Sequence, residues 1–99
     1  MTSHRITAIE MAKPSRQAAH RIITAVETDE AAGPHRWTVK KVLDAMNSAE
    51  RFYSQGANGR QARVQRYQCA ACSTDHIRTH ISDAAIHELT TLERRPATI

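Results

Sequence analysis

Aromatic residues are scarce in this sequence of 99 residues. Only 4% of the residues are aromatic, namely Trp37, Phe52, Tyr53 and Tyr67. A hydrophobic core must therefore consist largely of Ile, Val, Leu and Ala side chains, which predicts a core of modest stability. A chain of this length is sufficient for one core of ordinary size and leaves no room for a second. We therefore predict a single domain over residues 1–95 and a frayed tail over residues 96–99.

Long hydrophobic runs are absent as well. The N-terminal third contains no apolar run that resembles the core of a signal peptide. No stretch of the sequence approaches the ~20 consecutive apolar residues that a membrane-spanning helix requires. We therefore expect a cytoplasmic protein that is not associated with a membrane.

The composition is otherwise that of a folded, basic protein. Hydrophobic residues make up 40% and charged residues 24% of the chain, which argues against global disorder. The net charge is +4, and the basic residues are spread from Arg5 to Arg95 without a continuous block. This charge favours encounters with an anionic partner, either a nucleic acid or an acidic protein surface.

A near-repeat marks the N-terminal third. The segment His4–Glu10 recurs with one inserted residue as His20–Glu27. The first copy alternates apolar with polar residues and is rich in β-branched residues, which is typical of a half-buried strand. The second copy fits both a helix and a strand, and its similarity to the first favours a strand. We expect a loop over residues 11–19, a surface linker over residues 29–36, and solvent-facing side chains for His4 and His20.

A helix is predicted after Trp37. Thr38 is a suitable N-cap residue, and the helix should end near residues 47–48. Its apolar residues have the spacing of a helix face packed on a core and are Val39, Val42, Leu43 and Met46.

The remaining segments are predicted to form strands, with one ambiguity. Residues 51–55 indicate a short strand, and residues 56–59 have the composition of a tight turn leading into a second strand over 61–69. From His76 onward, a helix extending through residue 92 and a strand over 76–81 both fit the pattern of apolar residues.

Several short segments then follow one another along nearly the whole chain. They are His4-Arg5-Ile6-Thr7-Ala8-Ile9, His20-Arg21-Ile22 with Val26, Trp37-Thr38-Val39 with Val42, Phe52-Tyr53, Val64, Ile77-Arg78-Thr79, Asp83, and Leu89 with Leu92. In this order and spacing they resemble a family of bacterial proteins of about the same length, classed only as a domain of unknown function. The resemblance implies two N-terminal strands, one helix and three further strands. It implies no catalytic residue and no cofactor.

The sequence departs from the pattern of that family at two places. The segment Cys69–Cys72 stands where the family has an ordinary turn, and Ala84 replaces a glycine. With the strands and helix above, we predict a small α+β domain with an antiparallel sheet packed on one helix. The elements follow in the order β-β-α-β-β-β.

Two cysteines and two histidines suggest a metal site. Cys69, Cys72, His76 and His80 supply the four ligands that a tetrahedral zinc site requires, with His87 as a substitute for one histidine. A strand would hold His76 and His80 about 13 Å apart, too far to bind one ion, whereas a helix would make them neighbours. Zinc therefore competes with two unliganded thiols and with a redox role, and no other cofactor is expected.

Basic residues on the predicted hairpin suggest a nucleic-acid interface. Arginines beside aromatic residues on an exposed sheet suit phosphate contacts and base stacking. The candidate residues are Arg60, Arg63, Arg66, Arg78 and Tyr67 on the strands, with Lys40 and Lys41 on the helix. Because Arg63 and Arg66 occupy odd and even positions, they should point to opposite faces of a regular strand.

These patterns favour binding without catalysis. No histidine is paired with a placed nucleophile, and no oxyanion-hole motif is visible, so we do not expect an enzyme. A protein-interaction module is the leading prediction, including a homodimer that uses a sheet face or edge. Nucleic-acid binding and a small zinc-stabilised domain are the alternatives, and no small-molecule substrate is identified.

Overall fold

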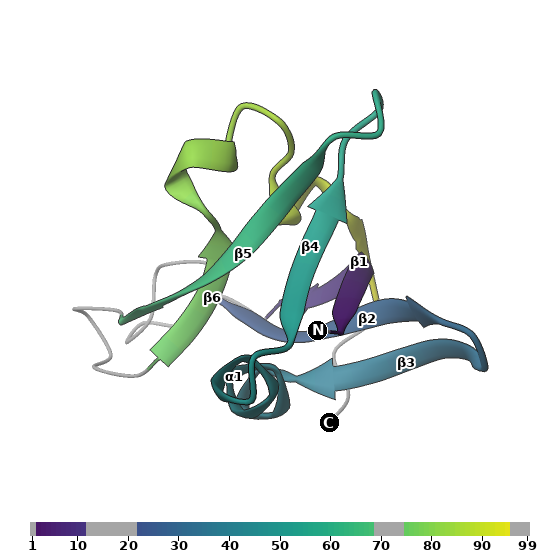
Figure 1. Ribbon diagram of the computed structural model, residues 1–99, viewed down its shortest axis with the longest axis vertical. Coiled ribbons are helices and arrows are strands. Elements are labelled where there is room, and N and C mark those ends of the chain that lie inside the picture. Colours follow the sequence, from purple (N-terminus) through teal and green to yellow (C-terminus); the bar gives the residue numbers. More distant parts are fainter. Residues whose placement is uncertain (1, 12–21, 69–74, 96–99) are drawn as a thin grey trace.

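The N-terminal segment forms the centre of the sheet. In the computed structural model, which describes residues 2–11, 22–68 and 75–95, strand β1 (Ser3–Met11) pairs antiparallel with β2 (Ile23–Glu30). On its other side, β1 pairs parallel with β4 (Arg51–Gln55) and, further along, parallel with β7 (Glu93–Arg94). Strand β1 therefore joins segments from both ends and the middle of the chain (Figure 1).

The complete sheet is mixed. Strand β3 (Gly33–Thr38) extends it beyond β2, and β5 (Gln61–Gln68) and β6 (Asp75–Thr79) extend it beyond β4. The strand order is β3-β2-β1-β4-β5-β6, with β7 added to β1. The α+β class is confirmed, but the prediction of a purely antiparallel sheet is wrong. A helix separates β1 and β2 from β4 along the chain, and such a crossover permits parallel pairing.

Residues 29–36 contain strand rather than linker. Strand β2 continues to Glu30, and only Ala31 and Ala32 separate it from β3. The two strands pair antiparallel from Ala25↔Thr38 to Glu30↔Gly33. The prediction of a surface linker is therefore wrong. Pro34 is tolerated in β3 because an edge strand does not need every backbone N–H group for pairing.

The predicted helix is confirmed. Helix α1 spans Val39–Asn47, and the Thr38 side chain caps it by accepting a hydrogen bond from the Lys41 backbone N–H at 3.3 Å. Val42 is fully buried, and Val39, Leu43 and Met46 pack against the core. None of the helices in the described ranges is long and apolar enough to cross a membrane.

The C-terminal part combines a strand with two short helical turns. The strand interpretation of the ambiguous segment is confirmed up to Thr79, where β6 ends. Two 3-10 helices follow, η1 (Ile81–Asp83) and η2 (Leu89–Thr91), so the alternative of one continuous helix is wrong. The second ambiguous segment is likewise a strand from residue 23 onward, and its residues 18–21 lie outside the described ranges.

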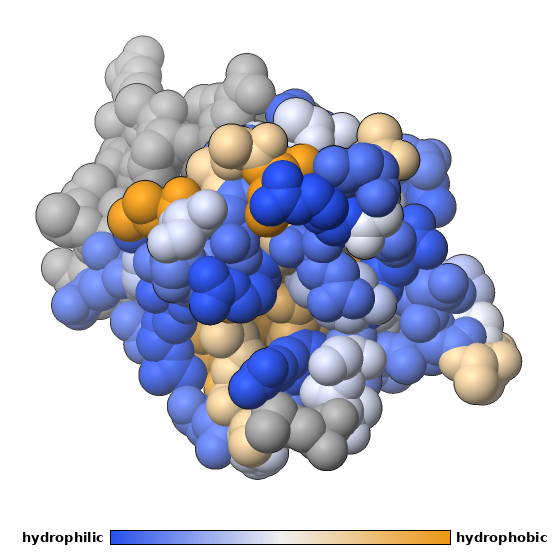
Figure 2. Space-filling view, turned by 45° about the horizontal axis from the view of Figure 1, so that its top comes forward, coloured by the Kyte–Doolittle hydropathy of each residue, from blue (hydrophilic) through white to orange (hydrophobic). Residues whose placement is uncertain are grey.

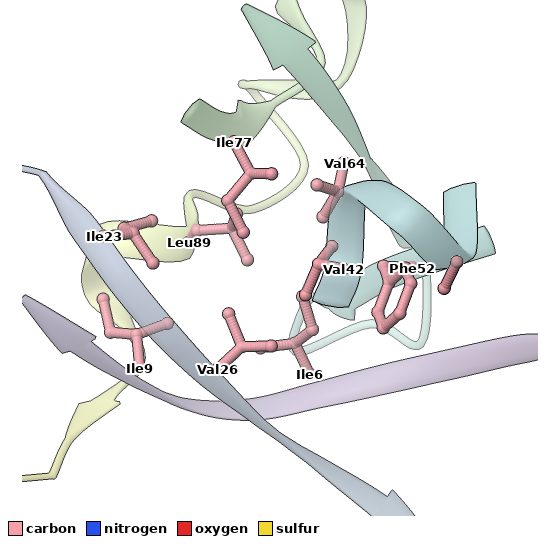
Figure 3. Packing of buried hydrophobic residues seen from close by; sticks show 10 residues of the cluster. Ile6, Ile9, Ile23, Val26, Val42, Phe52, Val64, Ile77 and Leu89 are labelled. Carbon is pink, nitrogen blue, oxygen red and sulfur yellow. The ribbon is translucent and has the colours of Figure 1, made fainter. Parts of the chain in front are cut away.

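The sheet curls around a core of aliphatic side chains. Ile6 and Ile9 of β1 and Ile23 and Val26 of β2 face the side chains of the later strands and of the helix (Figure 3). The opposing residues are Val42, Phe52, Val64, Ile77 and Leu89. The core is therefore largely aliphatic, with Phe52 as its fully buried aromatic residue among the described ones.

Candidate binding pocket

The pocket lies where strands β4 and β5 separate. These strands pair only from Tyr53↔Arg63 to Gln55↔Gln61, and from Val64 onward β5 pairs with β6 instead. The start of β4 and the middle of β5 therefore leave a space beside the C-terminal end of α1. This space is a pocket of 340 Å³ lined by Met46, Glu50, Arg51, Phe52, Arg63, Val64 and His80.

The pocket combines an apolar lining with charged groups. Met46, Phe52 and Val64 supply hydrophobic surface, whereas Glu50, Arg51, Arg63 and His80 supply polar atoms. Figure 2 shows hydrophobic atoms at the floor of a hollow on one face of the molecule, with hydrophilic side chains around it. A volume of a few hundred Å³ is sufficient for a small ligand or for one or two side chains of a partner.

Arg63 is held at the pocket by Asp83. Its side chain donates to both carboxylate oxygens of Asp83, at 2.8 and 3.3 Å, and its backbone N–H donates to Oδ2 at 2.8 Å. The hydrogen bonds from the Arg63 side chain and backbone lower the pKa of Asp83 to about 2. The charge of Arg63 is therefore compensated within the protein, and its guanidinium group is fixed in place.

Arg51 is the uncompensated cation of the pocket. Its backbone N–H donates to the carbonyl oxygen of Thr2 at 2.9 Å, which fixes the start of β4 beside β1. Its side chain is exposed and makes no hydrogen bond or ion pair with the part of the chain that the structure describes. Arg51 is therefore available to an anionic ligand group at the pocket.

Glu50 connects the pocket to a buried histidine. The Nε2 atom of His4 lies 2.8 Å from a carboxylate oxygen of Glu50, and its Nδ1 atom lies 2.7 Å from Glu30. Thr28 donates its hydroxyl hydrogen to Glu30 at 2.8 Å, and the Trp37 indole N–H donates to Thr28 at 2.8 Å. We name His4, Glu30 and Glu50 the carboxylate–histidine triad.

The His4 ring is enclosed by aromatic side chains. Its centroid lies 4.9 Å from those of both Trp37 and Phe52, and its plane stacks on the Phe52 ring. Burial lowers the pKa of His4, but the hydrogen bonds with Glu50 and Glu30 outweigh burial and raise the pKa above its ordinary value. The site therefore favours an imidazolium that donates to both carboxylates.

The sequence interpretation of His4 is wrong. We expected a solvent-facing side chain, but only 6% of His4 is exposed. The sequence contained a signal of this burial. His4 stands at the alternate position before Ile6 and Ala8, so the three residues share one face of β1, and all three are buried. His20 lies outside the described residues.

The predicted nucleic-acid residues have separate partners in the structure. Arg66 donates to the carbonyl oxygen of Leu43 at 3.3 Å and to Asn47 at 2.9 Å, at the end of α1. Arg78 instead lies 4.8 Å from the Tyr67 ring. Arg63 pairs with Asp83 of η1, whereas Arg66 bonds to residues of α1, so the two arginines contact different elements. The remaining candidates, Lys40, Lys41 and Arg60, are exposed on α1 and at the start of β5.

The predicted metal ligands have separate partners. His76 is buried with its ring 5.6 Å from the Tyr67 ring, whereas His80 accepts a hydrogen bond from the Ser82 backbone N–H at 3.1 Å. The Nδ1 atom of His87 lies 2.9 Å from the Ser54 hydroxyl oxygen. Across residues 2–11, 22–68 and 75–95, no three histidine, cysteine, aspartate or glutamate side chains are arranged so that they could hold a metal ion. Residues Cys69 and Cys72 lie outside these ranges, and the zinc site stays a prediction.

Comparisons with protein-family models, with curated proteins and with solved structures find no match to this chain. The resemblance to a family of bacterial proteins therefore stays a prediction.

Proposed function

We propose that the protein is a binding module without catalysis whose pocket receives a hydrophobic side chain next to a carboxylate of a protein partner. The observation that carries this proposal is the combination of an apolar lining with the uncompensated charge of Arg51. A carboxylate can form charge-assisted hydrogen bonds with the guanidinium group, while the adjoining side chain packs on Met46, Phe52 and Val64. The C-terminal residue of a polypeptide is the smallest group with both features.

The other charged groups limit what the pocket accepts. Arg63 is already paired with Asp83, so it shapes the pocket but attracts an anionic ligand less than Arg51 does. Glu50 brings a negative charge to the pocket wall and disfavours a ligand with several carboxylates. A single carboxylate beside an apolar group is therefore the best match in charge and polarity.

Binding can be tested with a minimal mimic of a polypeptide C-terminus. We expect N-acetylphenylalanine to shift the amide resonances of Met46, Glu50, Arg51 and Val64 in two-dimensional NMR spectra, with a Kd of about 1 mM. The neutral amide of the same compound should bind about fivefold more weakly, because it lacks the charge that Arg51 attracts. Arg51→Gln should reduce the affinity for the acid by about the same factor and leave that for the amide unchanged.

Arg5→Gln is the matched control for this substitution. Arg5 is an exposed arginine of β1 that is not part of the pocket lining, so its loss changes the net charge equally. We expect the affinity of Arg5→Gln to equal that of the wild type. Equal losses in the two variants, or resonance shifts that avoid the pocket residues, would contradict the proposal.

Nucleic-acid binding is the second candidate function. All six basic residues predicted for it are exposed, and the guanidinium group of Arg78 lies over the Tyr67 ring, an arrangement that also suits a nucleobase. If this function holds, the affinity for a fluorescent single-stranded oligonucleotide should fall about 100-fold between 50 and 200 mM salt, because phosphate contacts release counterions. Fluorescence anisotropy measures this dependence. No binding at low salt would exclude this candidate.

A further inference from the structure

Glu50 belongs to two sites at once. Its carboxylate is part of the pocket lining and also lies 2.8 Å from Nε2 of the buried His4. The backbone N–H of Glu50 donates to the carbonyl oxygen of Ala45 at 3.1 Å, which anchors this residue at the end of α1. Any change in the hydrogen bond with His4 therefore acts directly on the wall of the pocket.

The hydrogen bond between Glu50 and His4 depends on the protonation state of the His4 ring. Both ring nitrogens of His4 face carboxylate oxygens, at 2.7 and 2.8 Å. An imidazolium donates to both carboxylates, but a neutral imidazole has one N–H group and can donate to only one of them. Its other nitrogen then presents a lone pair to the second carboxylate, which is repulsive. Loss of the proton must therefore release one carboxylate.

The surroundings decide which carboxylate is released. Glu30 also accepts a hydrogen bond from the Thr28 hydroxyl. This bond is the largest of the causes that lower the pKa of Glu30, and the interactions with His4 lower it less. Within the described residues, Glu50 has no hydrogen-bond partner for its carboxylate other than His4. A neutral His4 therefore keeps its bond to Glu30 and loses the one to Glu50.

Charged and titratable groups lie around His4 and around the pocket that Glu50 lines. Glu30 approaches His4 from β2 and Glu50 approaches it from the α1–β4 connection, and Arg51, at the start of β4, lines the pocket beside Glu50. From β3, His35 contacts Trp37 and lies close enough to Glu30 to lower the pKa of that carboxyl group. His80, on the pocket wall, is a second histidine at the site, so its contribution has to be separated experimentally from that of His4.

We propose that the proton on His4 regulates the pocket, because its loss frees the Glu50 carboxylate to compete for Arg51 and weakens the binding of carboxylate ligands. This regulation rests on the proposed binding function. Affinity should be highest when His4 is protonated and should fall as the pH rises through the pKa of His4. By linkage, a bound carboxylate ligand should raise that pKa.

The first measurement needs no ligand. In the wild type, the NMR resonance of the Glu50 side-chain carboxyl carbon should shift with the same midpoint as the His4 ring resonances. The amide resonance of Ile9, buried elsewhere on β1, should not follow this midpoint. If the Glu50 resonance does not shift as His4 titrates, the proposal is overturned.

The second measurement follows ligand affinity with pH. Between about pH 5 and pH 9 the carboxylate of N-acetylphenylalanine stays ionised, so changes in affinity reflect the protein. We expect about fivefold weaker binding above the His4 midpoint than below it in the wild type. Glu50→Gln should bind with no such step, because a freed glutamine carries no charge. His80→Asn retains a residue suited to the cap of η1 and should keep the step, which excludes His80 as its source.

The outcomes separate the two proposals. Binding of N-acetylphenylalanine by Glu50→Gln with the full pH step would overturn regulation by His4 and leave the binding function standing. Absence of binding at every pH, in the wild type and in both variants, would contradict the binding function and the regulation with it. A pH step that disappears only in His80→Asn would assign the titration to His80 and overturn the role of His4.

Discussion

Replacing His4 with alanine is expected to lower the free energy of unfolding by about 3 kcal/mol at neutral pH. Two losses add in this variant. A cavity forms beside Trp37 and Phe52, and the carboxylates of Glu30 and Glu50 lose the donor between them. Chemical denaturation with urea, followed by circular dichroism, measures the change as a shift in the midpoint at constant slope.

Two control variants separate ring packing from charge. His4→Phe keeps an aromatic ring against Trp37 and Phe52, so its remaining destabilisation reports the loss of the donor. In the His4→Phe background, Glu50→Gln should recover part of this loss by removing one of two facing charges. A His4→Ala variant as stable as the wild type would show that the carboxylate–histidine triad contributes nothing to folding.

The contribution of His4 should also depend on pH. Because the pKa of His4 is raised in the folded state, its stabilising contribution is complete below the pKa of the unfolded chain and is lost as the pH rises through the folded value. The stability difference between the wild type and His4→Phe should therefore shrink towards alkaline pH. A difference that grows with pH would contradict the raised pKa.

Leu89→Ala is expected to destabilise the protein by a similar amount, about 3 kcal/mol. Leu89 is only 1% exposed although it belongs to a three-residue 3-10 helix, and it faces Ile23 and Ile77 across the core (Figure 3). Its backbone N–H is fixed by the Thr79 hydroxyl oxygen at 2.9 Å, so the segment cannot easily close a cavity left by truncation. Thermal or urea unfolding measures the loss.

Ile81→Ala is the matched control for Leu89→Ala. Ile81 is also an aliphatic residue of a 3-10 helix, but 69% of it is exposed. Its truncation should change the free energy of unfolding by less than about 0.5 kcal/mol. Similar effects of the two substitutions would mean that the C-terminal segment does not pack as the structure shows.

Local sequence signals predicted the elements that depend on neighbouring residues. Helix α1 was found because the Thr38 cap and the apolar stripe that includes Val42 lie within one short segment. Strand β3 was missed because Gly33 and Pro34 indicate a turn, whereas pairing with β2 is a property of the assembled sheet. The parallel pairing of β1 with β4 was missed for the same reason, since no local pattern specifies a distant partner.

The candidate pocket could be predicted only in part. Arg63 and His80 were selected from the sequence, but as nucleic-acid and zinc residues respectively. No sequence pattern identified Glu50 and Arg51 as pocket residues, because the pocket forms only where β4 separates from β5. The role of Glu50 also depends on His4, which lies 46 positions away in the sequence. Strand alternation identifies the face on which a side chain such as His4 lies, but it cannot identify the carboxylates that meet it there.

The central position of β1 also bears on how the chain reaches this fold. Ala8 of the first strand pairs with Glu93, nearly the whole length of the chain away, and Ser3 pairs with Arg51. Contacts between such distant residues slow folding, because long loops must close before the contacts form. During synthesis, one edge of β1 at Ala8 and Ile9 stays open until Glu93 and Arg94 have emerged. For that interval the nascent chain presents an unpaired strand edge that a second nascent chain could occupy, which exposes this strand to misassembly.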